Sequence, residues 1–296
     1  MATYRRCNSA IIILVTCLLA SNASLRSQPL GNPLNTDDEL FATYLVNSRL
    51  YADAILLIGR KNIEASSNPN LFRYLKGWSH YYLKQLDSAA ITLGSVGECS
   101  PVYLKSRFYS AYCWAHHGDL ESAIAITQSL ADTTPIMNEL RVTQLAGYNL
   151  LGRDLEGFTS NASHFTGNHY QFAENQMILN DLHDEIAGFK SKSPLAAGLL
   201  SAVVPGLGKV YAQRYGSGLS SFLTVAILGA ITWENYRKDG LTSTRTIAFG
   251  SLFALAYSAN IYGSVFSVKA YRDDFNQKMD HRILFHLHIP LRNVFN

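Results

Sequence analysis

Small residues, leucines and prolines recur at an interval of thirty-four residues in the first half of the chain. Ala123 follows Ala89 by thirty-four residues, and Ala89 follows Ala54 by thirty-five. Three further pairs keep the interval of thirty-four: Gly77 with Ala111, Leu86 with Leu120, and Pro101 with Pro135. A period of this length indicates a chain built from stacked supersecondary units, so it restricts the fold more than any single motif does.

Each unit is expected to be a pair of helices packed face to face. In the second unit, Gly77 on the first helix would face Ala89 on the second, and side chains this small let two helix backbones approach closely. Leu86 would close the contact at the turn between the helices. Pro101 would start the next unit, because proline is tolerated in the first turn of a helix.

These spacings resemble the tetratricopeptide repeat (TPR), whose consensus has small, aromatic or aliphatic, small and proline residues at these positions. The second and third units match it closely. A first unit, residues 37–66, keeps Ala42, Tyr51 and Ala54 but lacks the closing proline. A fourth, degenerate unit, residues 136–163, keeps Ala146 and Leu155, but has Tyr148 one place early and Phe158 instead of the second small residue.

A further helix is predicted after the fourth unit, since residues that could form one helix face recur at helical spacing. They are Phe172, Gln176, Leu179, Leu182 and Ile186. This helix would cap the stack, because each repeat leaves an apolar face that only a neighbour can bury. We therefore expect an all-α, TPR-like solenoid over residues 37–190, followed by a C-terminal transmembrane helical hairpin.

The resemblance implies a right-handed superhelix whose concave wall is lined by the first helix of each unit. The wall positions carried over are Leu71, Tyr74, Trp78, Tyr81 and Tyr82 from the second unit, and Lys105, Phe108, Tyr112 and His116 from the third. One interpretation is a groove for an extended or helical peptide, since Tyr and Trp give large contact areas at low entropic cost. The other is a groove filled by the chain itself, by residues 24–36 or by the capping helix.

Three stretches of the second half lack charged residues: 193–208, 217–233 and 246–268. The last two are long enough to cross a hydrocarbon core of about 30 Å, while the first is marginal. A membrane domain is therefore predicted over residues 191–270, with helix packing at small residues repeated every fourth position. These are Gly198, Ala202 and Gly206, and Gly250, Ala254 and Ser258. The absence of ionisable groups from these stretches disfavours a transporter.

The stretch PGLGKVYAQRYGSG, residues 205–218, is not a phosphate-binding loop. Tyr211 occupies the third glycine position of a dinucleotide fingerprint, and Val210 follows Gly208 and Lys209 where a Walker loop needs Ser or Thr. We expect the glycines to break the first apolar helix, with residues 210–215 continuing as a short interfacial segment.

The same stretch resembles a bacterial membrane-hairpin domain family with a P-G-x-G-x-x-Y motif and one or two apolar spans. The resemblance covers roughly residues 190–270 and implies no catalytic role. The motif positions are Pro205, Gly206, Gly208, Tyr211, Tyr215 and Gly218.

The number of spans stays open between two and three. With two spans and exported repeats, Arg237, Lys238 and Arg245 would lie in the cytoplasm. With three, Lys209, Arg214 and the basic residues after the last span would lie there, which the positive-inside rule favours. The shortness of the first stretch favours two.

Residues 1–23 are predicted to be a secretory signal peptide, with two arginines before an apolar run and small residues at a cleavage site. An uncleaved signal anchor is the alternative, and residues 24–36 would be a linker. The repeats would then lie outside the cytoplasm, where disulfides are possible. Cys99 and Cys113 are not expected to pair, because a helix starting at Pro101 would place them too far apart.

Residues 271–296 are expected to form a tail that begins as an amphipathic helix. The segment ILFHLHIP, residues 283–290, alternates and is predicted to be extended, with His286 and His288 on one side. No histidine has a recognisable metal-ligand spacing, so we predict no metal site and no cofactor. Net charge +3, with 25 Lys and Arg scattered among 22 Asp and Glu, gives no basic face for nucleic acid.

Together these features predict a membrane-anchored, non-catalytic interaction scaffold, located in a bacterial inner membrane. Its TPR units would bind a protein or peptide partner outside the cytoplasm. The alternative is an envelope or membrane-protein assembly factor that acts through its transmembrane hairpin.

Overall fold

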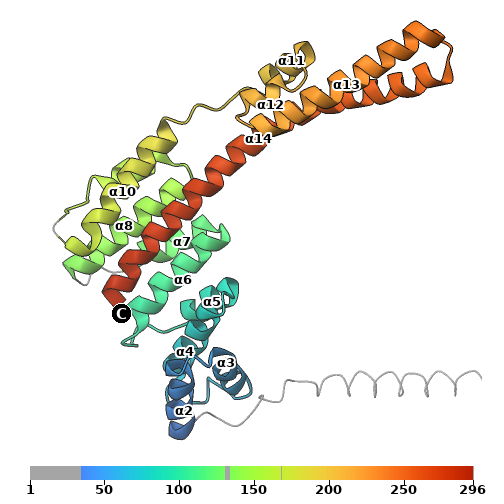
Figure 1. The fold of residues 1–296 in the computed structure, drawn as a ribbon. Helices are drawn as coiled ribbons and strands as arrows, with labels where there is room; N and C mark the ends of the chain where they lie inside the picture. Colours follow the sequence, from blue (N-terminus) through green and yellow to red (C-terminus); the bar gives the residue numbers. More distant parts are fainter. Residues whose placement is uncertain (1–34, 131–133, 168, 296) are drawn as a thin grey trace, which may run out of the picture. The chain divides into compact units, whose positions relative to one another are not determined.

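In the computed structural model, residues 35–130, 134–167 and 169–295 are described, and their regular structure is helical, with no extended strand. The chain divides into two compact units (Figure 1). The first runs up to Thr133 and includes Phe295, and the second covers Thr134–Val294. This division falls inside the region 37–190 that the sequence predicts as one repeat domain. The signal peptide and most of the linker lie outside the described residues.

The first unit consists of three helix pairs. Its helices are α2 (Thr36–Asn47), α3 (Tyr51–Gly59), α4 (Pro69–Tyr82), α5 (Leu86–Gly94), α6 (Tyr103–His117) and α7 (Leu120–Gln128). A long helix is followed each time by a helix of 9 residues that packs on it. Local signals fix the helix starts: Asn35 and Asp38 form a capping box, and Asn68 caps α4 ahead of Pro69. Pro101 lies in the turn before α6, which begins two residues later than predicted.

The turn inside each helix pair repeats the same backbone conformation. Arg49, Lys84, Gly118 and Arg153 all have a positive φ, and they follow one another at intervals of 35, 34 and 35 residues. Three of the four are not glycine, so these turns accept the cost of a left-handed residue. A device of local geometry thus recurs at the period of the sequence.

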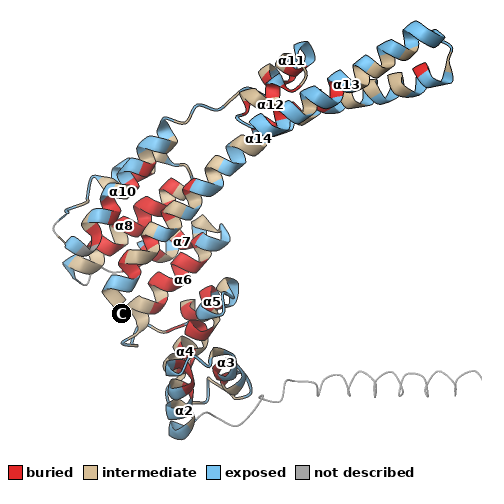
Figure 2. Cartoon of the chain, viewed as in Figure 1, coloured by how far each residue is buried: buried red, intermediate tan, exposed pale blue. Residues whose placement is uncertain are grey.

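Buried residues are concentrated on the helix pairs (Figure 2), and the predicted small positions are among them. A Cβ atom on Gly77 would lie 2.8 Å from Leu93 Cδ2, too close for any side chain there. The alanines at equivalent positions are fully buried: Ala42, Ala54, Ala89, Ala111, Ala123 and Ala146. Phe158, which replaces the small residue of the fourth pair, is also buried.

The second unit combines a fourth helix pair with the predicted capping helix and the apolar segments. Its helices are α8 (Pro135–Leu151), α9 (Leu155–Ala162), α10 (Tyr170–Ala187), α11 (Pro194–Val203), α12 (Leu207–Tyr211), α13 (Tyr215–Asp239) and α14 (Thr244–Phe295). The capping helix is confirmed as a helix, with Phe172, Leu179 and Leu182 fully buried. Helices α13 and α14 are long and apolar enough to cross a membrane by length and composition, whereas α11 has only 10 residues.

The tail is not a separate element, because α14 continues for 52 residues. The prediction of an extended segment at residues 283–290 is wrong. Ile283, Leu287 and Leu291 are fully buried at helical spacing, and Gln144 Nε2 of α8 donates to the Leu287 carbonyl at 2.8 Å. Packing on α8 therefore decides the conformation, and the alternation of His286 and His288 is coincidental.

Candidate functional site

Trp78 is the centre of an aromatic cluster on α4 and α6 in the first unit. Its ring centroid lies 5.8 Å from Tyr74, 5.4 Å from Tyr81, 5.3 Å from Tyr82 and 4.8 Å from Tyr109. The Lys105 ammonium lies 4.4 Å from the Trp78 centroid, in cation–π geometry. The structure therefore brings most of the predicted groove residues together and adds Tyr109, which the sequence argument missed because it lies between two wall positions of α6.

Much of the predicted groove wall is not accessible. Trp78, Tyr81, Phe108 and Tyr112 are buried, whereas Tyr82 is 45% exposed and His116 is exposed. Burial raises the pKa of Tyr74 and Tyr112 to about 12, and it lowers the pKa of Lys105. These shifts follow from desolvation, because an apolar surrounding disfavours the charged form.

A residue of the chain itself covers part of this wall. Phe295, which groups with the first unit, lies 5.8 Å from Phe108 between ring centroids, and its carbonyl accepts from Lys105 Nζ at 3.1 Å. The sequence argument considered residues 24–36 and the capping helix as occupants. Phe295 is not among these predicted occupants, because the sequence predicts the segment before it to be extended.

Exposed apolar residues, two of them aromatic, lie on α2. Leu40, Phe41 and Tyr44 of α2 are 67%, 50% and 60% exposed, and the Tyr51 ring stacks on Tyr82 with centroids 4.6 Å apart. No signal in the composition of α2 marks it as a surface. Its place in the repeat order does, because α2 belongs to the first predicted unit and only a neighbouring unit buries the apolar face of a repeat.

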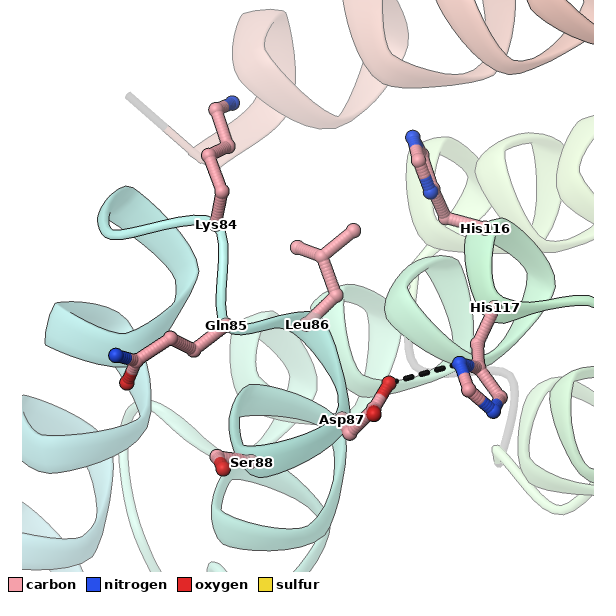
Figure 3. A pocket seen from close by; sticks show the side chains of 7 residues that line it. All are labelled: Lys84, Gln85, Leu86, Asp87, Ser88, His116 and His117. Carbon is pink, nitrogen blue, oxygen red and sulfur yellow. Dashed lines mark ion pairs between the residues drawn. The ribbon is translucent and has the colours of Figure 1, made fainter.

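A polar pocket of about 520 Å³ lies between the turn after α4 and the end of α6 (Figure 3). Asp87 pairs with His117 Nδ1 at 2.8 Å, and both side chains are more than half exposed, so the pair contributes at most about 1 kcal/mol. Figure 3 shows the Ser88 side chain on the far side of Asp87 from His117. The arrangement therefore does not form a nucleophile activated by a base.

The glycine motif forms a close crossing of α11, α12 and α13 in the second unit. Gly206 has φ +85° and its Cβ position is filled by the Gly218 carbonyl, while a Cβ on Gly208 would overlap the Ala197 carbonyl. A Cβ on Gly218 would lie 2.7 Å from Val210 Cγ2. The three glycines are thus required by close backbone approach, and Pro205 lies in the turn that breaks the apolar helix.

A buried polar network satisfies the backbone at this break. Asn260 Oδ1 accepts from Gly206 N at 2.9 Å, and its Nδ2 donates to the Ser201 carbonyl at 3.1 Å. Ser201 Oγ accepts from Gly208 N at 2.9 Å and hydrogen-bonds Ser264 Oγ at 2.6 Å. Asn260 of α14 and Ser201 of α11 thereby satisfy backbone groups that the break leaves without helical partners. Asn260 thus hydrogen-bonds from α14 to the end of α11 and to the turn that follows it.

The two motif tyrosines lie on different helices. Tyr211 ends α12 and Tyr215 begins α13, so the prediction of one interfacial segment over residues 210–215 is wrong. Gln213, with φ +62°, forces a turn between them. The Tyr211 hydroxyl accepts from Ser193 N at 3.3 Å, and Tyr215 is exposed.

The predicted small-residue stripes contribute unequally to packing. A Cβ on Gly198 would lie 3.3 Å from Val265 of α14, and one on Gly250 would lie 3.6 Å from Thr232 of α13. Ala202, Ala254 and Ser258 are exposed, and the Ala202 carbonyl accepts from the Tyr257 hydroxyl. The buried side-chain hydrogen bonds between α11 and α14 involve Ser201, Asn260 and Ser264.

The histidines of the described chain have ordinary partners. His169 pairs with the buried Glu139, which also accepts from Gln176 Nε2 at 3.0 Å, and His286 Nδ1 contacts Asn175 Oδ1 at 3.1 Å. Within the described residues, His, Cys, Asp and Glu form no group of three that could hold a metal ion. Cys99 is exposed and Cys113 is buried, and both are free thiols.

No protein-family model, curated protein sequence or solved structure matches the chain. The class that the structure defines is therefore a helical protein with two helices suited by length and composition to cross a membrane.

Proposed function

We propose that the protein is a membrane-anchored scaffold whose TPR-like helix pairs bind a protein or peptide partner, without catalysis. The observation that carries the proposal is the coincidence of two periods. Buried small residues and left-handed turns both recur every 34 or 35 residues, and the pairs present exposed aromatic side chains. Helical repeats commonly use such surfaces to bind other chains.

The partner surface that we propose is narrower than the predicted groove. Tyr82 is exposed and stacks on the half-buried Tyr51, and Phe41 and Tyr44 of α2 form an exposed pair with ring centroids 6.5 Å apart. Trp78 packs against Tyr82 from the buried side, and Tyr112 is buried as well. Replacing these two by alanine would remove core packing as well as any contact, so they are poor probes of binding.

Site-specific photo-cross-linking tests this proposal. A benzophenone amino acid at Tyr82 or Tyr44 is expected to give a discrete adduct in intact cells. The matched control is Ile91 of α5, an apolar residue in the same unit that is 63% exposed. Adducts at Ile91 alone, or none at Tyr82 and Tyr44, would contradict a partner-binding role for this surface.

We propose further that the hairpin of α13 and α14 anchors the protein in a bacterial inner membrane, with the repeats outside the cytoplasm. The predicted signal peptide supports this orientation. The membrane-facing side chains support the anchor, since Leu219, Leu223 and Ile227 of α13 are about half exposed or more, as are Leu252 and Leu255 of α14.

An assembly factor acting through the hairpin is the second candidate. Ala254 and Ser258 of α14 are exposed within the described structure, so a smooth face remains for another membrane helix. Changing both residues to Leu is expected to disrupt a membrane complex while cross-links at Tyr82 persist. Gly250 is left unchanged in this test because it packs near Thr232 within the hairpin.

A further inference from the structure

A small pocket lies in the second unit where α11 begins beside α14. Three cationic side chains line one part of it, Lys192, Lys269 and Arg272, and an apolar wall of Val265, Phe266 and Val268 lines the other. Its volume is about 230 Å³, below the roughly 300–1,000 Å³ of sites that enclose a drug-sized ligand. The pocket therefore suits one end of a larger molecule.

The cationic groups have capacity to bind an anion. Lys192 Nζ donates to the Tyr211 carbonyl at 2.6 Å and lies 4.6 Å from the Tyr271 ring centroid, which fixes its position and leaves two of its three N–H donors. In the part of the chain that the structure describes, Lys269 and Arg272 form no ion pair.

The carboxylates of the same stretch of α14 do not neutralise the pocket. Asp274 pairs with Arg214 at 2.9 Å, and Asp273 does not line the pocket. The start of α11 adds the partial positive charge of a helix N-terminus to the three cations. The field inside the pocket is therefore positive.

The rim of the pocket continues into an apolar surface. Phe266 is 64% exposed, and Leu195 and Leu199, one turn apart on α11, are 73% and 61% exposed. A positive pocket next to an exposed apolar strip at the end of a membrane helix matches a molecule with an anionic head and hydrocarbon chains.

We propose that Lys192, Lys269 and Arg272 bind the phosphate group of an anionic phospholipid whose acyl chains lie along Leu195, Leu199 and Phe266. This inference rests on the proposed membrane anchoring by α13 and α14. The proposed site would make the protein prefer anionic lipids, a preference that the apolar helices α13 and α14 alone do not have.

The test uses the full-length protein in nanodiscs of phosphatidylcholine with a minor fraction of phosphatidylglycerol. After detergent extraction, native mass spectrometry measures the ratio of the two lipids retained on the protein. The variant Lys269→Gln/Arg272→Gln removes two exposed charges at the pocket. The control Arg237→Gln/Lys238→Gln removes two exposed charges from the C-terminal end of α13. Lys269→Arg/Arg272→Lys keeps both charges.

The wild-type protein is expected to retain phosphatidylglycerol in excess of its share of the disc. Removing the two pocket charges should lower that preference about 30-fold, from roughly fivefold for each charge. The control and the charge-conserving variant should keep it. An equal ratio in the wild-type and the pocket variant would overturn the site, as would full displacement of the lipid by inorganic phosphate, which would indicate a site for the free ion.

The two proposals fail in different ways. A chain that enters discs without selecting phosphatidylglycerol contradicts only the phosphate site. A chain that does not enter discs contradicts the membrane anchor, and this site with it. Partner cross-links at Tyr82 are measured independently of both.

Discussion

At the scale of single residues, the glycines of the motif illustrate how a backbone crossing restricts side chains. Gly208 lies against the Ala197 carbonyl, while Gly216, eight residues later, has no atom within 4 Å of its Cβ position. Both glycines belong to the glycine-rich stretch 205–218, and packing requires a glycine at only one of the two positions. Sequence alone assigns both to one glycine-rich stretch.

Gly208→Ala is therefore expected to destabilise the second unit, by about 1–3 kcal/mol or more, because the added methyl group forces α11 and α12 apart. Gly216→Ala should be neutral or stabilising by up to about 1 kcal/mol, since alanine is the better helix former. Thermal unfolding in detergent, followed by fluorescence, measures both. Equal melting temperatures for the two variants would contradict the crossing.

Cys113 gives a second prediction at this scale. Burial raises the pKa of its thiol to about 12, so at pH 8 its thiolate fraction is roughly a thousandfold or more below that of an ordinary cysteine. Iodoacetamide should modify the exposed Cys99 and leave Cys113 intact until the first unit unfolds. Peptide mapping after timed alkylation checks this, and modification of Cys113 at the rate of Cys99 would show that its site is open.

At the scale of elements, the C-terminal half of α14 behaves as a core helix. Met279, Ile283, Leu287 and Leu291 are fully buried, and Arg153 pairs with Asp280 at 2.8 Å. The side chain of Leu287 fills the space beside Gly147 of α8. This helix thus completes the group formed by α8, α9 and α10.

Leu287→Ala is expected to lower the stability of the second unit by about 2–5 kcal/mol, the usual cost of a cavity at a fully buried leucine. Phe285→Ala is the matched control, because Phe285 lies on the same helix and is 61% exposed. Denaturant unfolding of both variants gives the difference in the free energy of unfolding. A loss for Phe285→Ala as large as for Leu287→Ala would mean that the opposite face of α14 packs.

The elements also show what the sequence could and could not predict. Helices with their own caps and small contact residues were predictable, as at Pro135 and Ala89, because those signals are local. The helical state of residues 283–290 depends on contacts with α8, which is far away in the chain. The burial of Trp78 likewise depends on the residues that surround it in space. The wall positions implied by the TPR resemblance lie together around Trp78, but their accessibility depends on which other segments cover them.

At the scale of the whole molecule, two spans place the two flanks of the hairpin on one side of the membrane. Helix α11 is about 15 Å long at 1.5 Å per residue, half of the roughly 30 Å that a span requires. With two spans, residues 188–193 before α11 and the stretch after the apolar part of α14 are expected on the same side of the membrane, opposite the turn at residues 240–243. With three spans, the residues before α11 and the stretch after the apolar part of α14 would lie on opposite sides of the membrane.

Single cysteines at Ser191, Asp273 and Leu241, all exposed, distinguish these arrangements. In intact cells, an impermeant maleimide should either label both Ser191→Cys and Asp273→Cys or label neither. Leu241→Cys should give the opposite result. The native cysteines are replaced by serine in every variant. Opposite labelling of Ser191→Cys and Asp273→Cys would establish a third span. Labelling at Ser191→Cys from outside would support export of the repeats.

The continuity of α14 also has a consequence for biosynthesis. The residues that close the core of α8 and α10, from Met279 to Leu291, leave the ribosome only after both apolar helices have been made. Until then the nascent chain carries α8 with an open apolar face that a chaperone could bind. Completion of this core is thus timed after the synthesis of α13 and of the apolar part of α14.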